Sequence, residues 1–213
     1  MEELTLLGER AVQAKYELQR MTTEKKNEVL EAVAEALIQN TEYLLLENHK
    51  DLERGIANEM NPGLVDRLRL TKERIAGMAE GIRQIVKLPD PVGEILDDYE
   101  AENGLHIVKK RVPMGVIGII YESRPNVTAD AFGLCFKSGS AVILRGGSDA
   151  IRSNMAITKV IQDAVVRRGV DPYVIQLIES TDRSVVNEFM KMKQYVDLLI
   201  PRGGAGLIRN VVE

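Results

Sequence analysis

The sequence predicts an α/β protein: a Rossmann-like parallel sheet preceded by an N-terminal helical segment and a projecting β-hairpin. Apolar residues recur at helical spacing through the first ninety residues, and two charged extended runs flank Asn103-Gly104. From Gly115 onward, short runs rich in Val and Ile alternate with helical segments. We therefore divide the chain into a helical part (residues 1–93), a hairpin (94–112) and a Rossmann-like core (113–213).

Composition excludes several classes of protein. Of the 213 residues, 45% are hydrophobic, which is enough for a substantial core, and the net charge of −4 gives no basic field for nucleic acid. No signal segment opens the chain, and no run reaches the ~18 apolar residues of a membrane helix. The single cysteine fits a reducing, cytoplasmic location. His49 and His106 lie far apart without nearby ligands, so we expect surface histidines and no metal site.

Four helices are expected in the first part, each with an apolar stripe at three- and four-residue spacing. Such stripes indicate packing faces rather than chemistry. The first helix carries a stripe from Leu4 to Met21, and Thr22 or Thr23 caps the second. The third helix runs from Asn40 or Thr41 to about Asn58, and Asn61-Pro62-Gly63 then breaks the chain. The fourth helix begins at Thr71 and is ended by Pro89 and Pro91.

Residues 94–112 read EILDDYEAENGLHIVKKRV. Asn103-Gly104 favours a two-residue type I′ turn, because both central positions of that turn need a positive φ. The flanking runs carry many charges, so we expect a β-hairpin that projects from the body. It is either an ordinary solvated hairpin or a contact between subunits.

The core is expected to alternate between strands and helices. Strands that are apolar throughout are typical of a parallel sheet covered on both faces. In chain order, the expected strands are 116–121, 141–144, 174–178 and 196–200, and the expected helices are 126–137, 148–168, 184–192 and a last one from Gly206. Ligands bind beyond the carboxyl ends of such strands. The candidate ligand loops are therefore 121–126, 145–149, 179–182 and 201–205.

Two of these loops place an arginine and two glycines where a helix begins. They are Arg145-Gly146-Gly147-Ser148 and Pro201-Arg202-Gly203-Gly204-Ala205. Glycines let a ligand approach the backbone, and a helix N-terminus beside an arginine attracts phosphate. Each loop taken alone also fits an ordinary tight turn. Neither is a P-loop or the usual dinucleotide Gly-x-Gly-x-x-Gly.

The loop after the second core strand also bears on the choice of cofactor. It offers Arg145 and Ser148 first, and Asp149 only inside the expected helix. A carboxylate at this place favours NAD, whereas an arginine accommodates the 2′-phosphate of NADP. We therefore expect NADP(H).

The loop after the first core strand reads Glu122-Ser123-Arg124-Pro125-Asn126. Arg124 has the charge to hold a carboxylate or a phosphate, and Asn126 either caps the next helix or directs its amide at an oxyanion. Cys135 lies late in that helix, on a face shared with Ala131 and Leu134. Because a reactive thiolate favours a helix N-terminus or a cationic neighbour, we expect Cys135 in the core.

Longer stretches resemble a known family. The run PMGVIG at residues 113–118 and KSGSAV at 137–142 resemble the aldehyde dehydrogenase superfamily. YESRPNVTADAFGLCFKSGSAVILRGG and LLIPRGGAGLIRNV are similar, within it, to the gamma-glutamyl phosphate reductase family, and the likeness extends over essentially the whole chain. The resemblance implies an aldehyde dehydrogenase-like fold. It also implies cytoplasmic, NADPH-dependent reduction of L-glutamate 5-phosphate to L-glutamate 5-semialdehyde and phosphate through a cysteine thioester, the second step of proline biosynthesis.

The resemblance also implies roles for particular residues. The implied cofactor contacts are Ile119, Ile120, Tyr121, Arg145, Gly146, Gly147, Ser148, Pro201, Arg202, Gly203, Gly204 and Ala205. The implied substrate contacts are Glu122, Ser123, Arg124 and Asn126, with Asn126 as a candidate oxyanion donor. The hairpin at 94–112 resembles an oligomerisation arm, which implies a homo-oligomer, and the pathway implies a functional association with glutamate 5-kinase.

One departure from the family limits what this chain does alone. The catalytic cysteine of the family lies downstream in a second domain, and Cys135 does not match its position. We therefore expect the cofactor-binding part of a longer enzyme, inactive alone, with exposed apolar side chains at the sheet edge. The alternative is a catalytically inactive NADP-binding fragment. A CoA-acylating branch is a third interpretation, which the Arg-Pro-Asn and Arg-Gly-Gly loops disfavour.

Overall fold

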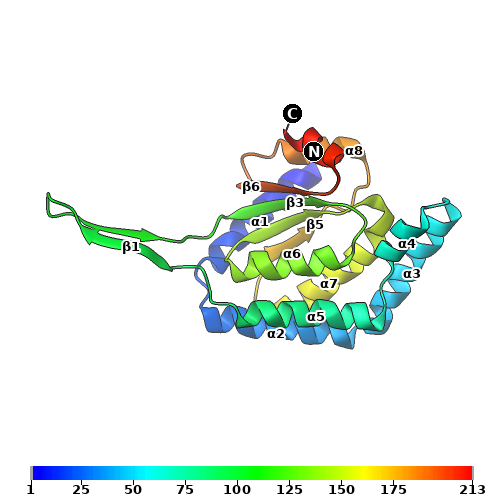
Figure 1. Ribbon diagram of the computed structural model, residues 1–213, viewed down its shortest axis with the longest axis horizontal. Helices are drawn as coiled ribbons and strands as arrows, with labels where there is room; N and C mark the ends of the chain where they lie inside the picture. Colours follow the sequence, from blue (N-terminus) through cyan, green and yellow to red (C-terminus); the bar gives the residue numbers. More distant parts are fainter. Residues whose placement is uncertain (1, 213) are drawn as a thin grey trace.

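The computed structural model of the protein describes residues 2–212. It shows a layered α/β body from which a long two-stranded arm extends (Figure 1). The expected fold class is confirmed, because N-terminal helices, an antiparallel hairpin and a parallel sheet follow one another along the chain. No described helix is long and apolar enough to cross a lipid bilayer.

The N-terminal helices follow the expected stripes, with one addition. They are α1 (Glu2–Leu18), α2 (Thr23–Gln39), α3 (Thr41–Ala57), α4 (Pro62–Leu68) and α5 (Lys72–Lys87). The Thr22 hydroxyl caps α2, as expected, by accepting a hydrogen bond from the Lys25 N–H. The expected break at residues 61–63 is wrong. Asn61 caps α4 by accepting from the Gly63 N–H, and Pro62 fits the first helical turn because its missing N–H has no partner there.

The arm consists of β1 (Ile95–Glu100) and β2 (His106–Lys110), paired antiparallel and exposed along both strands. The expected type I′ turn is wrong. Only Gly104 takes a positive φ, of 82°, and its N–H donates to the Ala101 carbonyl while the Ala101 N–H donates to Leu105. These bonds enclose a three-residue loop that ends in a left-handed glycine, the second common hairpin geometry.

The sheet consists of β3 (Val116–Tyr121), β4 (Ala141–Arg145), β5 (Ile175–Leu177) and β6 (Leu198–Arg202). All pairs are parallel, in the order β5-β4-β3-β6. The bounds of three strands differ from expectation: β4 ends one residue later, and β5 and β6 differ at both ends. Val174 belongs to the 3₁₀ turn η2 (Pro172–Val174), and β6 begins at Leu198 and includes Pro201 and Arg202. A proline is tolerated there because β6 is an edge strand of the described sheet.

The remaining helices are α6 (Asn126–Lys137), α7 (Ile151–Arg167), α8 (Arg183–Met190) and α9 (Ala205–Val212). The helix expected from Ser148 starts instead with a 3₁₀ turn, η1 (Ser148–Ala150), and α8 begins and ends earlier than the expected 184–192. At the edge strand and the last helix, Ile200 and Ile208 are exposed. These are the apolar side chains expected at this edge.

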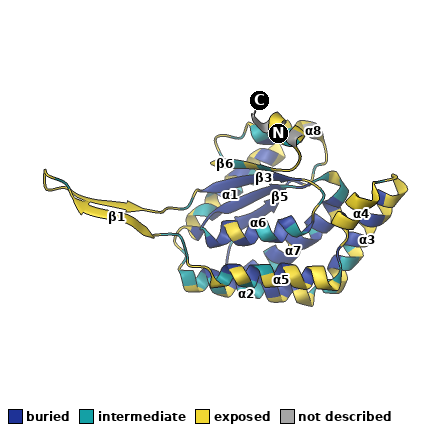
Figure 2. Ribbon diagram, viewed as in Figure 1, coloured by how far each residue is buried: buried dark blue, intermediate teal, exposed yellow. Residues whose placement is uncertain are grey.

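The layers are clear in Figure 1. Helices α6 and α7 cover one face of the sheet, and α1 packs against the other. Helices α2, α3 and α5 lie outside α6 and α7 and shield them from solvent. The buried residues, dark blue in Figure 2, fill the sheet and the inner helices and are absent from the arm.

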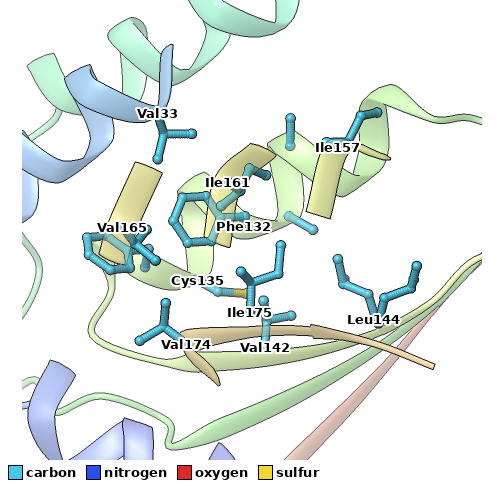
Figure 3. Packing of buried hydrophobic residues seen from close by; sticks show 14 of the residues in the cluster. Val33, Phe132, Cys135, Val142, Leu144, Ile157, Ile161, Val165, Val174 and Ile175 are labelled. Carbon is cyan, nitrogen blue, oxygen red and sulfur yellow. The ribbon is translucent and has the colours of Figure 1, made fainter. Parts of the chain in front are cut away.

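Cys135 lies in this core, among Phe132, Val142 and Ile175 (Figure 3). The expectation of a packing role is confirmed: the residue is 5% exposed, and burial raises the pKa of its thiol to about 12. The expectation that Leu134 shares the face of Cys135 is wrong, because Leu134 is 56% exposed whereas Cys135 is buried. His49 and His106 are both at the surface, as expected.

Candidate functional site

A cavity of about 1010 Å³ lies beyond the carboxyl ends of β3, β4 and β6. Ile120 pairs with Arg145 of β4 and with Pro201 of β6, so the three strands end level with one another. All four expected loops contribute residues, including Thr181 from the loop after β5. The cofactor and substrate candidates that line the cavity are Ile120, Tyr121, Glu122, Ser123, Arg124, Arg145, Gly147, Ser148, Arg202, Gly203 and Gly204.

Other candidates are held away from this cavity. Ile119 is buried within β3, and Pro201 pairs with β3 inside the sheet. Gly146 packs so closely on Asn154 that a Cβ would overlap the Asn154 amide. The structure therefore does not bring these three residues to the cavity. The side chain of Ala205 lies outside the described residues, and its backbone begins α9.

Arg145 brings a partly buried positive charge to the cavity. Its guanidinium donates to the carbonyls of Gly146 (2.9 Å) and Thr181 (3.3 Å), and it forms no ion pair with any carboxylate in the described structure. Burial lowers the pKa of Arg145, which is the sign of a poorly solvated cation, and its Nε is buried without an acceptor. A cation in this state favours an anionic ligand.

Asp149 lies closer to this cavity than the sequence suggested. It belongs to η1 rather than to the body of a helix, it lines the cavity, and it accepts a hydrogen bond from the Ser123 hydroxyl (2.9 Å). The cavity therefore offers a carboxylate as well as Arg145. Asp149 is thus within a helical turn, as expected, but it is not kept away from the cavity, and Arg145 alone favours NADP.

Glu122 lies against the glycine turn that follows β6. Its Oε1 accepts from the Gly204 N–H (3.2 Å), and a Cβ on Gly203 would come within 2.8 Å of its carboxyl group. The turn thus already holds an anionic oxygen on a backbone N–H. A phosphate oxygen has the chemistry to take the same place.

Asn126 fills neither of its expected roles towards this cavity. Pro125 occupies the cap position of α6, and the Asn126 side-chain amide donates to Asp130 (3.1 Å). Asn126 instead lines a second cavity, of about 380 Å³, between α4, α5 and the start of α6. Sequence reasoning missed this cavity. The one local signal is the four-residue spacing of Asn126 and Asp130, which places both on one helix face.

The larger cavity fits a phosphorylated nucleotide. It combines the uncompensated Arg145, the glycine turn at 203–204 and room for a sizeable ligand. Within the described residues, no group of three His, Cys, Asp or Glu side chains is placed to hold a metal ion.

Comparison with known proteins gives one consistent result. The aldehyde dehydrogenase family model matches residues 2–213. Gamma-glutamyl phosphate reductases of Lachnospira eligens and Clostridium botulinum are 56% and 52% identical to the chain, over 212 and 213 residues. Each alignment covers 100% of this chain and 51% of the relative, so the chain spans about half the length of these curated relatives.

Solved structures agree. The crystal structure of gamma-glutamyl phosphate reductase from Thermotoga maritima superposes with a TM-score of 0.96 at 41% identity, covering 99% of this chain and 51% of that one. The enzyme of the same name from Saccharomyces cerevisiae gives 0.90 at 29% identity, covering 98% and 53%. An acetylating aldehyde dehydrogenase from Geobacillus thermoglucosidasius gives 0.77 at 19% identity, a likeness of fold alone.

Proposed function

The chain belongs to the aldehyde dehydrogenase family, and from this premise we propose that it binds the cofactor of a gamma-glutamyl phosphate reductase. That enzyme would reduce L-glutamate 5-phosphate with NADPH to L-glutamate 5-semialdehyde and phosphate, in proline biosynthesis. One observation carries the proposal: all four loops that follow the strands line one cavity, together with Arg145, which has no carboxylate partner among the described residues. The identity to gamma-glutamyl phosphate reductases along the whole chain supports the choice of substrate.

Each part of the cavity has a task in this proposal. Arg145 holds the 2′-phosphate, and the backbone N–H of Gly204 holds a diphosphate oxygen once Glu122 turns away. Ser123 and Asp149 lie near enough to the strand ends to bind ribose hydroxyls. Bound NADPH would supply the hydride that reduces the acyl carbon.

The thioester-forming nucleophile would come from the half of the relatives' length that this chain does not span. Cys135 is unsuited to the task, because a thiol with a pKa of about 12 is protonated at neutral pH and only 5% of the residue is exposed. The contribution of this chain is therefore to bind and orient the cofactor.

Three further expectations belong to the proposal. The exposed arm at 94–112 would join subunits into a homo-oligomer, since its strands carry apolar side chains such as Tyr99 and Ile107 that pack on nothing in the body. The enzyme would work in the cytoplasm, where Cys135, the one cysteine of this chain, stays reduced. It would associate functionally with glutamate 5-kinase, because that kinase supplies the acyl phosphate.

Isothermal titration with NADPH and NADH tests the cofactor assignment. In the protein expressed at the full length that its gene encodes, Arg145→Ala should weaken NADPH binding about 10- to 100-fold, the worth of a charge-assisted hydrogen bond, and NADH binding by less than about 3-fold. Arg152→Ala is the matched control: Arg152 is an exposed arginine that does not line the cavity. An equal loss of both cofactors would contradict the role of Arg145.

A substrate panel on the same protein tests the reaction. The expected result is turnover of the acyl phosphate in preference to an acyl-CoA. A reversed preference would favour the CoA-acylating branch. NADPH binding without any turnover would favour a non-catalytic NADP-binding protein, and turnover that Cys135→Ser abolishes would show that the nucleophile is misassigned.

A further inference from the structure

The smaller cavity lies beside the larger cavity, and the two share part of their lining. It is bounded by α4, by α5 and by the start of α6, and Arg67 and Arg124 line both cavities. Its volume of about 380 Å³ is near the lower end of the roughly 300–1,000 Å³ typical of ligand pockets. A small metabolite fits this space, with one end directed through the Arg67–Arg124 boundary towards the cofactor cavity.

One wall of the smaller cavity carries an unneutralised carboxylate. Asp130 is partly buried on α6, and the hydrogen bond recorded for its side chain comes from the neutral amide of Asn126. No lysine, arginine or histidine nitrogen of the described structure lies within ion-pair distance of it, and burial raises the pKa of its carboxyl group. The charge of Arg202 opposes this rise in pKa without forming an ion pair with Asp130. A cationic ligand in the cavity would supply the direct ion pair that Asp130 lacks.

Four arginines also line the smaller cavity, and among the described residues only one of them pairs with a carboxylate. Arg74 pairs with both carboxylate oxygens of Asp66 at 3.2 Å and donates to the Arg69 carbonyl. Arg67, Arg69 and Arg124 form no ion pair with any described carboxylate. A guanidinium that is not paired within the protein suits the planar geometry of a carboxylate ligand.

Helix α5 leaves room in this cavity. Gly77 lines the cavity from the interior of the helix, where glycine is less favourable than alanine, and a Cβ at this position would meet nothing within 4 Å. A larger residue here would therefore project into the cavity without displacing the protein. This gives a way to block the cavity that leaves its charges unchanged.

We infer that the smaller cavity binds the α-amino acid end of the substrate, with its ammonium group on Asp130 and its α-carboxylate on Arg69. Asp130 would repel a simple anion and the arginines would repel a simple cation, so a zwitterion satisfies both kinds of charge. The inference rests on the proposed function, which places the reacting acyl phosphate in the larger cavity. Arg124 and Arg67 lie between the two ends.

Paired substrates test this assignment in the protein at its full natural length. The oxidative direction is measured with phosphate and NADP⁺, using glutamate 5-semialdehyde and 5-oxopentanoate, which lacks the α-amino group. Asp130→Asn should lower kcat/KM for the semialdehyde about 10- to 100-fold, mainly through KM, and for 5-oxopentanoate less than about 3-fold. Asp163→Asn is the matched control: Asp163 also accepts from a side chain four residues away on its helix, but lines neither cavity.

If Asp130 is merely structural, Asp130→Asn should reduce the rate with both substrates equally. An equal reduction, or no change with either substrate, would overturn the inference and leave the proposed function standing.

A binding measurement keeps the inference testable without turnover. L-glutamate, but not glutarate, should bind the wild-type protein. Gly77→Leu should abolish that binding and leave NADPH binding unchanged. Absence of L-glutamate binding to a folded wild-type protein that binds NADPH would refute the inference, whereas failure to bind NADPH would refute the proposed function.

Discussion

At the scale of single residues, a buried carboxylate links the N-terminal helices to the cofactor cavity. Asp51 of α3 has no exposed side-chain surface and accepts from the Ser153 N–H (2.8 Å), the Ser153 hydroxyl (2.7 Å) and Arg54 (2.7 Å). Arg54 also donates to the carbonyls of Ser148 (2.8 Å) and Asp149 (3.1 Å). This network fixes both the start of α7 and the loop that borders the cavity.

Removal of Arg54 should therefore affect stability in a pH-dependent way. Burial raises the pKa of Asp51, and the Arg54 charge opposes that rise. In Arg54→Ala the pKa should rise further, so ionised Asp51 becomes more costly in the folded state and stability falls as pH rises through the window above the unfolded pKa. We expect a loss of about 1 to 3 kcal/mol at pH 8 and a smaller one at pH 4, where Asp51 is largely protonated.

Urea denaturation at the two pH values measures this difference. Lys159→Ala, which breaks an exposed ion pair on α7, is the control and should lose little at either pH. An equal loss at pH 4 and pH 8 would mean that Arg54 acts by packing rather than by charge.

The thiol of Cys135 offers a second test at this scale. Because burial raises its pKa to about 12, the native thiol should resist iodoacetamide at pH 8 and react only after unfolding in urea. Mass spectrometry of the peptide that contains Cys135 reads the labelling directly. Rapid labelling of the native protein would show that the segment opens to solvent.

At the scale of elements, the packing of strand β3 requires a glycine at position 118, where there is no room for a side chain. A Cβ on Gly118 would come within 2.8 Å of both Phe189 of α8 and Leu199 of β6. Gly118→Ala should overpack this junction and destabilise the protein by about 1 to 3 kcal/mol, measured by urea denaturation. Gly77→Ala is the matched control. Its Cβ meets open space in a helix, so the protein should gain about 0.5 to 1 kcal/mol.

Local patterns predict most elements and misplace those that depend on distant partners. The apolar run of β3 and the stripe of α5 are local, and both appear where expected. Pro201 reads as the end of a strand, yet β6 continues through it, because the backbone N–H that proline lacks is not needed at an edge. Asn103-Gly104 fits two hairpin geometries, and the sequence alone does not separate them.

At the scale of the whole molecule, the arm contributes no buried residue, so it can be removed without opening the core. Hydrogen bonds between Gly93 and Arg111 (3.0 Å) and between Arg111 and Glu94 (2.9 Å) close its base. Replacing residues 95–110 by a short glycine-serine turn should leave the thermal transition unchanged and reduce the oligomer, measured by sedimentation velocity. An unchanged mass would contradict the proposed role of the arm in assembly.

The larger cavity was predictable from the sequence as a cavity at the strand ends, and the smaller cavity was not. The first follows from a rule about strand ends, which needs only the order of the elements. The second exists because α4 and α5 pack beside α6, which brings Arg69 to Asp130 across sixty residues of chain. No local spacing in the sequence predicts that Arg69 and Asp130 line the same cavity.

The position of α1 has a consequence for how the protein is made. Leu4, Ala11, Ala14 and Leu18 pack on the sheet, against β4, β5 and η2. During synthesis α1 leaves the ribosome well before β4, β5 and η2, so its apolar stripe stays unpacked until those elements have been made. A nascent chain in this state is a natural client for chaperones. Slow translation of residues 141–177 would prolong the time during which the apolar stripe of α1 is exposed, and would favour aggregation over folding.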